Sequence, residues 1–311
     1  MTLEIKNVYK SFGTKEVLKD VSFLATSGSA LGLLGRNGAG KTTIMRIIMR
    51  FFNADSGNVL LDNKAFYPEN YSIGYLPEER GLYPKKTIGS QLIYLGQLKG
   101  LNAKDAKINT TKWLERLGLE DQFNKKLNTL SKGNQQKIQL AASLVNNPDI
   151  VILDEPFSGL DPVNAVLLKN IVRDLVDEGK IVIFSSHQMN YVEEFCDKIA
   201  LLNQGTIVLH DSIFNIKKSY PTDNIHVSFT NPQSISSIES FVKEYTKACE
   251  SLKGGVNNER EAFSFKLHLK EDVSKDAMLK LFVEANYEID DYHVIEPTLE
   301  EIFVEKAGGS I

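Results

Sequence analysis

The length and composition of this chain exclude several classes of protein. Its 311 residues are more than one typical domain needs, and 42 % hydrophobic with 24 % charged residues is ordinary for a globular protein. A net charge of −4 gives no reason to expect nucleic-acid binding. The apolar runs are strand-sized, short of the ~18–20 residues of a membrane span, and the N-terminus lacks a signal-peptide pattern. We therefore expect a cytoplasmic protein that reaches a membrane only through a partner.

The N-terminal region combines strand patterns with a glycine-rich loop. Residues 2–35 alternate as short strands, and Ala30–Leu34 is an apolar run typical of a buried strand. The following loop, Gly35-Arg36-Asn37-Gly38-Ala39-Gly40-Lys41-Thr42, fits the phosphate-binding pattern G-x-x-x-x-G-K-[ST] at each fixed position. A helix pattern over Thr43–Phe51 completes the strand, loop and helix that this motif requires.

The chemistry of this loop indicates a nucleoside triphosphate with magnesium, that is, ATP and Mg²⁺. Glycines let the backbone fold tightly with its N–H groups pointing inward, and the helix N-terminus adds partial positive charge. Lys41 is placed to reach the β- and γ-phosphates, and the Thr42 hydroxyl to bind Mg²⁺. We expect the nucleotide to contact Gly35, Arg36, Asn37, Gly38, Ala39, Gly40, Lys41, Thr42 and Thr43.

The middle of the chain changes from strands to helices and back. Gly57–Leu61 and Ser72–Leu76 are strand candidates, and apolar spacing over Thr87–Asn146 predicts a helical subdomain at about residues 87–146. Strand and helix patterns then alternate, which predicts a parallel sheet with helices on its faces. The alternating segments are Ile150–Leu153, Val163–Val176, Ile181–Phe184, Met189–Phe195 and Ile199–Leu202.

Two carboxylates follow the first of these strands. Asp154 and Glu155 end the apolar segment that begins at Asp149, a pattern typical of a Walker B element. Asp154 is placed to hold Mg²⁺, directly or through water. Glu155 is placed to orient or deprotonate the attacking water.

The C-terminal region predicts a second, smaller domain. Lys217–Asp223 has the composition of a linker, which divides the chain into a cassette of residues 1–220 and an α+β accessory domain of residues 221–311. In the second domain we expect strands at Asn224–Phe229, Ala262–Lys270 and Tyr287–Ile295, and helices at Ser234–Cys249 and Lys275–Ala285. A last helix begins with a capping box at Thr298. The scattered histidines, His210, His226 and His293, are interpreted as exposed or structural.

Further motifs carry a family resemblance. Leu130-Ser131-Lys132-Gly133-Asn134-Gln135-Gln136 resembles the signature motif of ATP-binding-cassette (ABC) proteins, and Ser158-Gly159-Leu160-Asp161 resembles their D-loop. His187 is similar to the switch histidine, Phe12 to the aromatic residue that stacks on adenine, and Tyr75–Glu78 to the Q-loop. The resemblance covers roughly residues 1–210. It implies an α/β P-loop NTPase fold of ABC-cassette type, with a mixed sheet core, an antiparallel β subdomain and an α-helical subdomain.

The resemblance also implies roles for single residues. His187 would bind the γ-phosphate and hold the attacking water with Glu155, and Phe12 would stack on the base. Ser131 and Gly133, with Asn134 and Asp161, would close the site of an opposite cassette. Lys132 and Asn134 depart from the usual signature. Glu78 replaces the usual Gln, so it offers an oxygen to water or Mg²⁺ but loses the amide donor.

The function implied is an ATP-binding and ATP-hydrolysing subunit of a membrane ABC transporter. Two cassettes, either two copies or two different chains, would pair around ATP and drive an integral-membrane permease from the inner face of the cell membrane. A loop near Glu78–Lys86 would contact the permease through Arg80, Tyr83, Lys85 and Lys86. Glu296–Phe303 and Tyr75–Pro84 resemble bacterial drug, antibiotic and sodium exporters, which indicates export.

Two other functions fit the sequence less well. A cassette ATPase that acts on ribosomes or DNA is disfavoured, because those branches carry two cassettes in one chain or long coiled coils between their motifs. A GTP-binding switch would need Asn-Lys-x-Asp. Asn124-Lys125-Lys126-Leu127 and Asn63-Lys64-Ala65-Phe66 both lack the aspartate.

Overall fold

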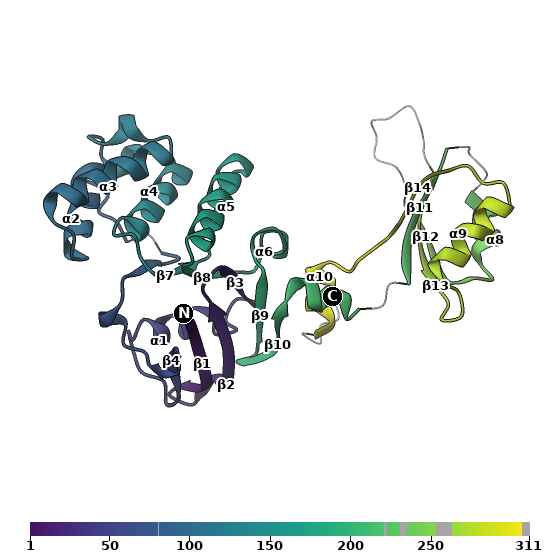
Figure 1. Ribbon diagram of the computed structural model, residues 1–311, viewed down its shortest axis with the longest axis horizontal. Coiled ribbons are helices and arrows are strands. Elements are labelled where there is room, and N and C mark those ends of the chain that lie inside the picture. Colours follow the sequence, from purple (N-terminus) through teal and green to yellow (C-terminus); the bar gives the residue numbers. More distant parts are fainter. Residues whose placement is uncertain (80, 221–222, 231–234, 253–262, 307–311) are drawn as a thin grey trace. The chain divides into compact units, whose positions relative to one another are not determined.

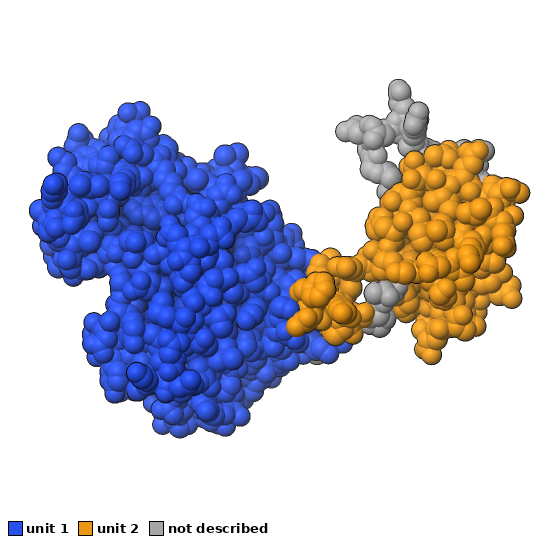
Figure 2. All heavy atoms as spheres, in the orientation of Figure 1, with its two compact units in different colours: residues 1–213, 299–311 blue, residues 214–298 orange. Residues whose placement is uncertain are grey.

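The computed structural model describes residues 1–79, 81–220, 223–230, 235–252 and 263–306 (Figure 1). The chain divides into two compact units, one of residues 1–213 with 299–311 and one of residues 214–298 (Figure 2). The second unit therefore begins before the predicted boundary at residue 220 and ends before the last helix. Within the described residues, no helix is both long enough and apolar enough to cross a membrane.

An antiparallel sheet forms one layer of the first unit. Its strands are β1 (Thr2–Phe12), β2 (Lys15–Thr26), β4 (Ser56–Leu61) and β5 (Lys64–Ala65), in the order β2-β1-β4-β5. Alternate residues of β1 and β2 are buried in a core that also contains residues of the central sheet. This layer is the predicted antiparallel β subdomain. Because buried and exposed residues alternate along much of its strands, apolar and polar residues alternate in the sequence, and this alternation predicts strands.

The central sheet of the first unit has six strands in the order β10-β9-β3-β8-β7-β6. Four neighbouring pairs are parallel, and β10 runs antiparallel to β9, so the sheet is mixed as predicted. β7 and β8 are buried at every residue, which explains their unbroken apolar runs. The strands are β3 (Ser29–Leu34), β6 (Ile73–Leu76), β7 (Ile150–Asp154), β8 (Ile181–Ser186), β9 (Lys198–Asn203) and β10 (Thr206–Ser212).

The helices near this sheet confirm the predicted alternation. They are α1 (Lys41–Ile48), α5 (Pro162–Asp177), α6 (Met189–Phe195) and α10 (Leu299–Lys306), with α7 (Ile213–Lys218) at the border between the units. The helix predicted to run to Phe51 ends at Ile48, because Arg50 has a left-handed φ of +54° that no helix continues through.

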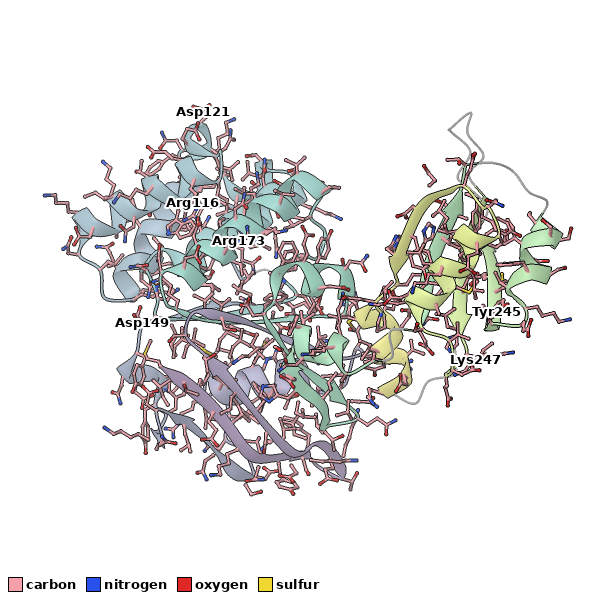
Figure 3. All side chains as sticks on the ribbon, turned by 45° about the vertical axis from the view of Figure 1, so that its right-hand side comes forward. Arg116, Asp121, Asp149, Arg173, Tyr245 and Lys247 are labelled. Atoms are coloured by element: carbon pink, nitrogen blue, oxygen red, sulfur yellow. The ribbon has the colours of Figure 1, made fainter. Side chains whose placement is uncertain are left out.

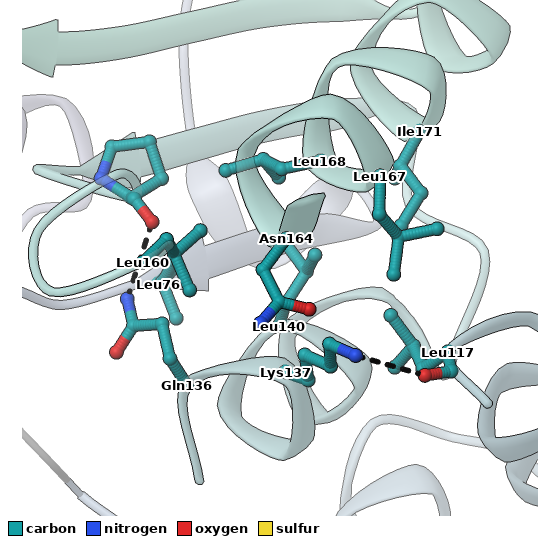
Figure 4. Close-up of a pocket in the computed structure, with 11 residues that line it drawn as sticks. Leu76, Leu117, Gln136, Lys137, Leu140, Leu160, Asn164, Leu167, Leu168 and Ile171 are labelled. Carbon is teal, nitrogen blue, oxygen red and sulfur yellow. Dashed lines mark hydrogen bonds between the residues drawn. The ribbon is translucent and has the colours of Figure 1, made fainter. Parts of the chain in front are cut away.

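The helical subdomain contains α2 (Ile88–Leu98), α3 (Ala103–Arg116) and α4 (Lys132–Leu144), as predicted for residues 87–146. Arg116 at the end of α3, which Figure 3 labels, forms an ion pair with Asp174 on α5. Lys137 on α4 donates to the Leu117 carbonyl beside a narrow apolar pocket between α4 and α5 (Figure 4). Short 3₁₀ turns lie at Pro68–Asn70, Glu120–Gln122 and Leu127–Thr129.

The second unit is an antiparallel sheet with two helices on one face. Its strands, in the order β12-β13-β11-β14, are β11 (Asn224–Phe229), β12 (Thr246–Leu252), β13 (Phe263–Leu269) and β14 (Ile289–Val294). Inward residues such as Ile225, Val227 and Leu267 pack with Met278 and Phe282. The helices are α8 (Ile235–Val242) and α9 (Lys275–Glu284).

One predicted element of this unit is wrong. The helix expected over Ser234–Cys249 ends at Val242, and Thr246–Leu252 is instead β12, paired with β13. Cys249 lies opposite Leu267 in that pair. Pairing with a neighbouring strand overrides a weak helical pattern, which the sequence of the segment alone does not reveal. Ser234 and Ala262 lie outside the described residues.

Candidate functional site

The glycine-rich loop turns sharply between β3 and α1. Gly38 and Gly40 have left-handed φ values of +82° and +113°. A Cβ on Gly40 would lie 2.6 Å from Leu18 Cδ2, so both the conformation and the space require glycine there. Gly40 precedes α1 without a side-chain cap. Backbone N–H groups of the first turn therefore remain available for an anion.

Lys41 is buried at the start of α1, only 6 % exposed. Its Nζ donates to the Gly35 carbonyl at 2.7 Å and lies 3.6 Å from Oε1 of Glu155. The ammonium group is thus held between the loop and the carboxyl end of β7. A buried charge of this kind requires partners of opposite sign, and one more anion can be accommodated on its remaining N–H groups.

Asp154 and Glu155 are held by a serine of the neighbouring strand. Ser185 Oγ donates to Oδ1 of Asp154 at 2.5 Å and accepts the backbone N–H of Glu155 at 2.9 Å. Oδ2 of Asp154 is buried and has no hydrogen-bond partner among the described residues. Buried carboxylate oxygens are normally satisfied, so this atom fits a metal ligand.

Glu155 joins the lysine to the predicted switch histidine. Nδ1 of His187, which follows β8, lies 3.0 Å from the same Oε1 that faces Lys41. Glu155 has a left-handed φ of +49°. The left-handed conformation turns the chain sharply directly after β7. His187 is half exposed, and Glu155 is buried.

Lys41, Asp154 and Glu155 line a cleft of about 440 Å³, a size suited to a small molecule, and His187 reaches it only through its contact with Glu155. The cleft is lined by Phe12, Lys15, Val17, Arg36, Asn37, Gly38, Gly40, Lys41, Thr42, Thr43, Glu78, Asp154 and Glu155. Most of the predicted nucleotide contacts, taken from distant parts of the sequence, are therefore brought together. Of the loop residues, Gly35 contributes its carbonyl to Lys41, and Ala39 is buried beneath the loop.

Phe12 lies at the rim of this cleft with half of its side chain exposed. Its ring packs edge-on against Phe52 with centroids 5.4 Å apart, and Lys10 Nζ lies 5.5 Å from its centroid. The ring is thus supported from the protein side. This arrangement leaves apolar surface at the cleft for a flat partner such as a base.

Comparison with known proteins settles the family. The family model "ABC transporter" matches residues 18–158, and "ATP-binding protein DrrA1-3-like, C-terminal domain" matches residues 212–307. The chain is 36 % identical over 310 residues to the uncharacterized ABC transporter ATP-binding protein YhaQ of Bacillus subtilis, covering 98 % of each chain. The chain belongs to the ABC transporter ATP-binding proteins. It binds ATP and hydrolyses it, and this hydrolysis is coupled to transport.

Other relatives agree with this assignment. The linearmycin resistance ATP-binding protein LnrL of Bacillus subtilis is 30 % identical over 320 residues, covering 99 % of each chain. The solved structure of an ATP-binding subunit of an ABC transporter superposes with a TM-score of 0.65 and 26 % identity, over 70 % of this chain and 92 % of that chain. ABC ATPases in general work as pairs of cassettes together with membrane permeases.

The predicted signature and D-loop residues lie outside the cleft that their own chain forms. Ser131, Gly133 and Asn134 are at the N-terminus of α4, where Ser131 Oγ accepts the Asn134 N–H at 3.3 Å. Asp161 caps α5, and the N–H of Asn164, which it accepts at 2.9 Å, lowers the pKa of the carboxyl. None of these residues lines the cleft within the described part of the chain.

Two buried residues of this ABC protein were not predicted. Ser185 holds both carboxylates, as described above. Gln139 on α4 donates to the carbonyls of Pro77 and Glu79 at 3.3 and 2.9 Å, which ties the helical subdomain to the Q-loop. A polar residue at the carboxyl end of a parallel strand was a usable signal for Ser185. The sequence contains no such signal for Gln139, because its hydrogen-bond partners lie about 60 positions away.

Glu78 borders a second, adjoining pocket with Thr42 and Asp154. Its side chain is exposed, in contrast to the buried Asp154. Tyr75 lines the same pocket, and burial, aided by the negative charge of Asp154, raises the pKa of its hydroxyl. The three predicted metal ligands, Thr42, Glu78 and Asp154, thus line one pocket together with the protonated hydroxyl of Tyr75.

Proposed function

We propose that this ATPase is the energy-supplying subunit of an exporter whose transmembrane permease is a separate chain. The observation that carries the proposal is a cleft lined by Lys41, Asp154 and Glu155, with His187 3.0 Å from Oε1 of Glu155. The direction of transport is supported by the likeness to LnrL, whose name denotes resistance to linearmycin. Its working place, on this proposal, is the inner face of the cell membrane beside the permease.

Mg²⁺ is proposed as the resident metal of the nucleotide site. Asp154 would hold it through the unpartnered Oδ2, and the Thr42 hydroxyl lies at the same cleft. Glu78 lines the same cleft with an exposed carboxylate, which would take part through water. When bound, Mg²⁺ neutralises charge on the phosphate oxygens.

We assign the chemical step to Glu155. Its carboxylate is buried, with Oε1 3.0 Å from His187 Nδ1 and 3.6 Å from Lys41 Nζ. In this proposal Glu155 accepts the proton of the attacking water, His187 orients that water and contacts the γ-phosphate, and Lys41 donates to the β- and γ-phosphates. Phe12 stacks on adenine, and residues 35–43 enclose the phosphates.

A second cassette is proposed to complete each site. Ser131 and Gly133 begin α4, where backbone N–H groups and the Ser131 hydroxyl favour an anion, yet their own cleft is lined by other residues. Ser131, Gly133, Asn134 and Asp161 are therefore proposed to contact ATP held by an opposing cassette. The opposing cassette is either a second copy of this chain or a different one.

The loop after the Q-loop is proposed to contact the permease. Tyr83 is 64 % exposed, and Lys85 and Lys86 are exposed beside it. Arg80 lies outside the described residues. Gln139 holds the carbonyls of residues 77 and 79, so a movement of α4 on ATP binding would be passed to this loop.

We also propose that the chain divides into a cassette of residues 1–220 and an accessory domain of residues 221–311.

Purification of the tagged chain from detergent-solubilised membranes of its own host tests the proposal. A polytopic membrane protein recovered in stoichiometric amount is the expected result. Recovery of ribosomes or DNA with no membrane protein would instead support the alternative, non-transport function. Deletion of the loop of residues 79–86 is the matched control, because it should release the permease while the chain still binds ATP.

A further inference from the structure

Three side chains of types that commonly bind metal ions lie together on one face of the sheet of the second unit. His226 is on β11, and Asp291 and His293 are on β14. In the antiparallel register His226 lies opposite His293, and Ser228 lies opposite Asp291. Strand side chains alternate between the two faces, and the neighbours Ile225 and Val227 are buried with α8 and α9. The three polar side chains therefore share the face that these helices do not cover.

The three groups converge on one carboxylate oxygen. His226 Nδ1 lies 3.1 Å from Oδ2 of Asp291, and His293 Nδ1 lies 2.8 Å from the same atom. The two imidazole rings stack with centroids 4.8 Å apart and planes 24° from parallel. The three ligand atoms all lie within 4.8 Å of one another. One atom of each side chain thus points at the same small volume.

We propose that His226, Asp291 and His293 form a binding site for a divalent transition-metal ion of the Zn²⁺ class. Two imidazole nitrogens with one carboxylate oxygen are a donor set that such ions prefer, whereas Mg²⁺ and Ca²⁺ prefer oxygen alone. Bonds of about 2.0–2.1 Å in a tetrahedron place ligand atoms roughly 3.3 Å apart. The two carboxylate pairs, at 3.1 and 2.8 Å, reach this with shifts of a few tenths of an ångström, and the two imidazole nitrogens, which lie within 4.8 Å of each other, must also approach.

Metal binding would set the tautomer of both imidazoles. Each neutral imidazole carries one proton, which moves from Nδ1 to Nε2 so that the Nδ1 lone pair faces the ion. Asp291 and His293 are about half exposed, so water can enter as the fourth ligand. Lys266 lies across from His226 on β13 and adds a positive charge nearby. That charge opposes binding.

The simpler alternative is a hydrogen-bonded trio without an ion, in which both Nδ1–H groups donate to Asp291. Two separate histidine–carboxylate pairs could use both carboxylate oxygens, but here both rings use Oδ2. Coordination would require both rings to turn from Oδ2 so that the two Nδ1 atoms and Oδ2 face one common point. The two arrangements differ in one measurable property, which is affinity for the ion.

Titration of the untagged full-length chain with ZnCl₂ against a chromophoric chelator distinguishes them. We expect one ion to bind per chain, with at least a tenfold loss of affinity in His226→Ala, His293→Ala and Asp291→Asn. His268→Ala is the matched control, because His268 is a half-exposed histidine of the same sheet with its own partner, Asp223. Cys249→Ser controls for the thiol on β12.

The outcomes are decisive in both directions. Circular dichroism must show that each variant is folded, and the double variant His226→Gln/His293→Gln replaces any alanine variant that is not. Retention of one-to-one binding by His268→Ala and Cys249→Ser, with its loss in the double variant, supports the site. Absence of saturable binding, or equal binding by wild type and double variant, would overturn it. So would a loss in His268→Ala or Cys249→Ser as large as that in His226→Ala.

Discussion

Ser185 donates its hydroxyl to Asp154 at 2.5 Å while it accepts the backbone N–H of Glu155 at 2.9 Å. One fully buried hydroxyl therefore fixes the orientation of the carboxylate proposed to hold Mg²⁺ and the strained backbone of the proposed base. Because Oδ1 of Asp154 is engaged by Ser185, Oδ2 is the oxygen left for a metal. Ser185 is thus a positioning residue that acts through the two acids.

Ser185→Ala is expected to weaken the response to magnesium. The substitution leaves the Glu155 N–H and Asp154 Oδ1 without their partner, which costs about 1–3 kcal/mol for a buried polar group. The Mg²⁺ concentration that half-saturates ATP hydrolysis should rise, because the Asp154 carboxylate is free to rotate. ATPase rates over a Mg²⁺ titration measure this.

Ser186→Ala is the matched control for that experiment. Ser186 is also buried at the end of β8, but its hydroxyl accepts the Gln188 N–H and touches neither acid. Both variants should lower thermal stability, and only Ser185→Ala should shift the Mg²⁺ dependence. An equal shift in both variants would mean that general loosening of β8, not the Asp154 contact, is responsible.

Glu155→Gln is expected to retain ATP binding and to reduce hydrolysis by roughly 10²–10⁴-fold, the usual contribution of a general base. The amide keeps the size of the side chain and a hydrogen-bonding oxygen but does not accept a proton from water. Single-turnover hydrolysis and equilibrium ATP binding separate the two effects. Glu178→Gln, an exposed glutamate, is the control. Turnover near the wild-type rate would exclude Glu155 as the base.

Lys41→Ala is expected to weaken ATP binding itself, by roughly 1.5–3 kcal/mol or about 10- to 150-fold, since charged hydrogen bonds to phosphate are lost. Lys15→Ala supplies the comparison, because Lys15 lines the same cleft but is exposed. Binding of a fluorescent ATP analogue measures both variants. If the two substitutions weaken binding equally, net charge rather than the position of Lys41 governs affinity.

The sequence predicted the first unit well because its elements follow strong local rules. The phosphate loop needs glycine where φ is left-handed, and β7 and β8 are apolar because both faces are buried. Asp154 and Glu155 could be placed because catalytic groups gather at the carboxyl ends of parallel strands.

What remained hidden depends on pairing between distant segments. The contact of Ser185 with Asp154 exists because β8 lies beside β7, and no local pattern gives strand order. The same reason explains β12, which was mistaken for helix, and the pair His226 and His293, which are 67 positions apart and were interpreted separately. Strand pairing and register bring together side chains that are distant in the sequence, and the sequence alone does not show which strands pair.

The last helix gives a test of where the two units divide. Leu299 and Ile302 of α10 are buried, and the Leu299 N–H donates to Glu193 on α6 at 3.4 Å. The Arg36 guanidinium lies 6.0 Å from the ring centroid of Phe303. These contacts place α10 on the cassette that binds ATP, although the sequence assigned residues 221–311 to a separate domain.

Ile302→Ala should therefore destabilise the cassette, by about 2–5 kcal/mol for a buried isoleucine. Scanning calorimetry with and without ATP identifies the cassette, because a ligand raises the melting temperature only of the unit that binds it. We expect Ile302→Ala to lower the transition that ATP raises. Val283→Ala, which removes a mostly exposed side chain of α9, should move neither transition much. If Ile302→Ala lowers only the melting temperature of the transition that ATP does not shift, α10 belongs with the accessory sheet and the boundary near residue 220 is right.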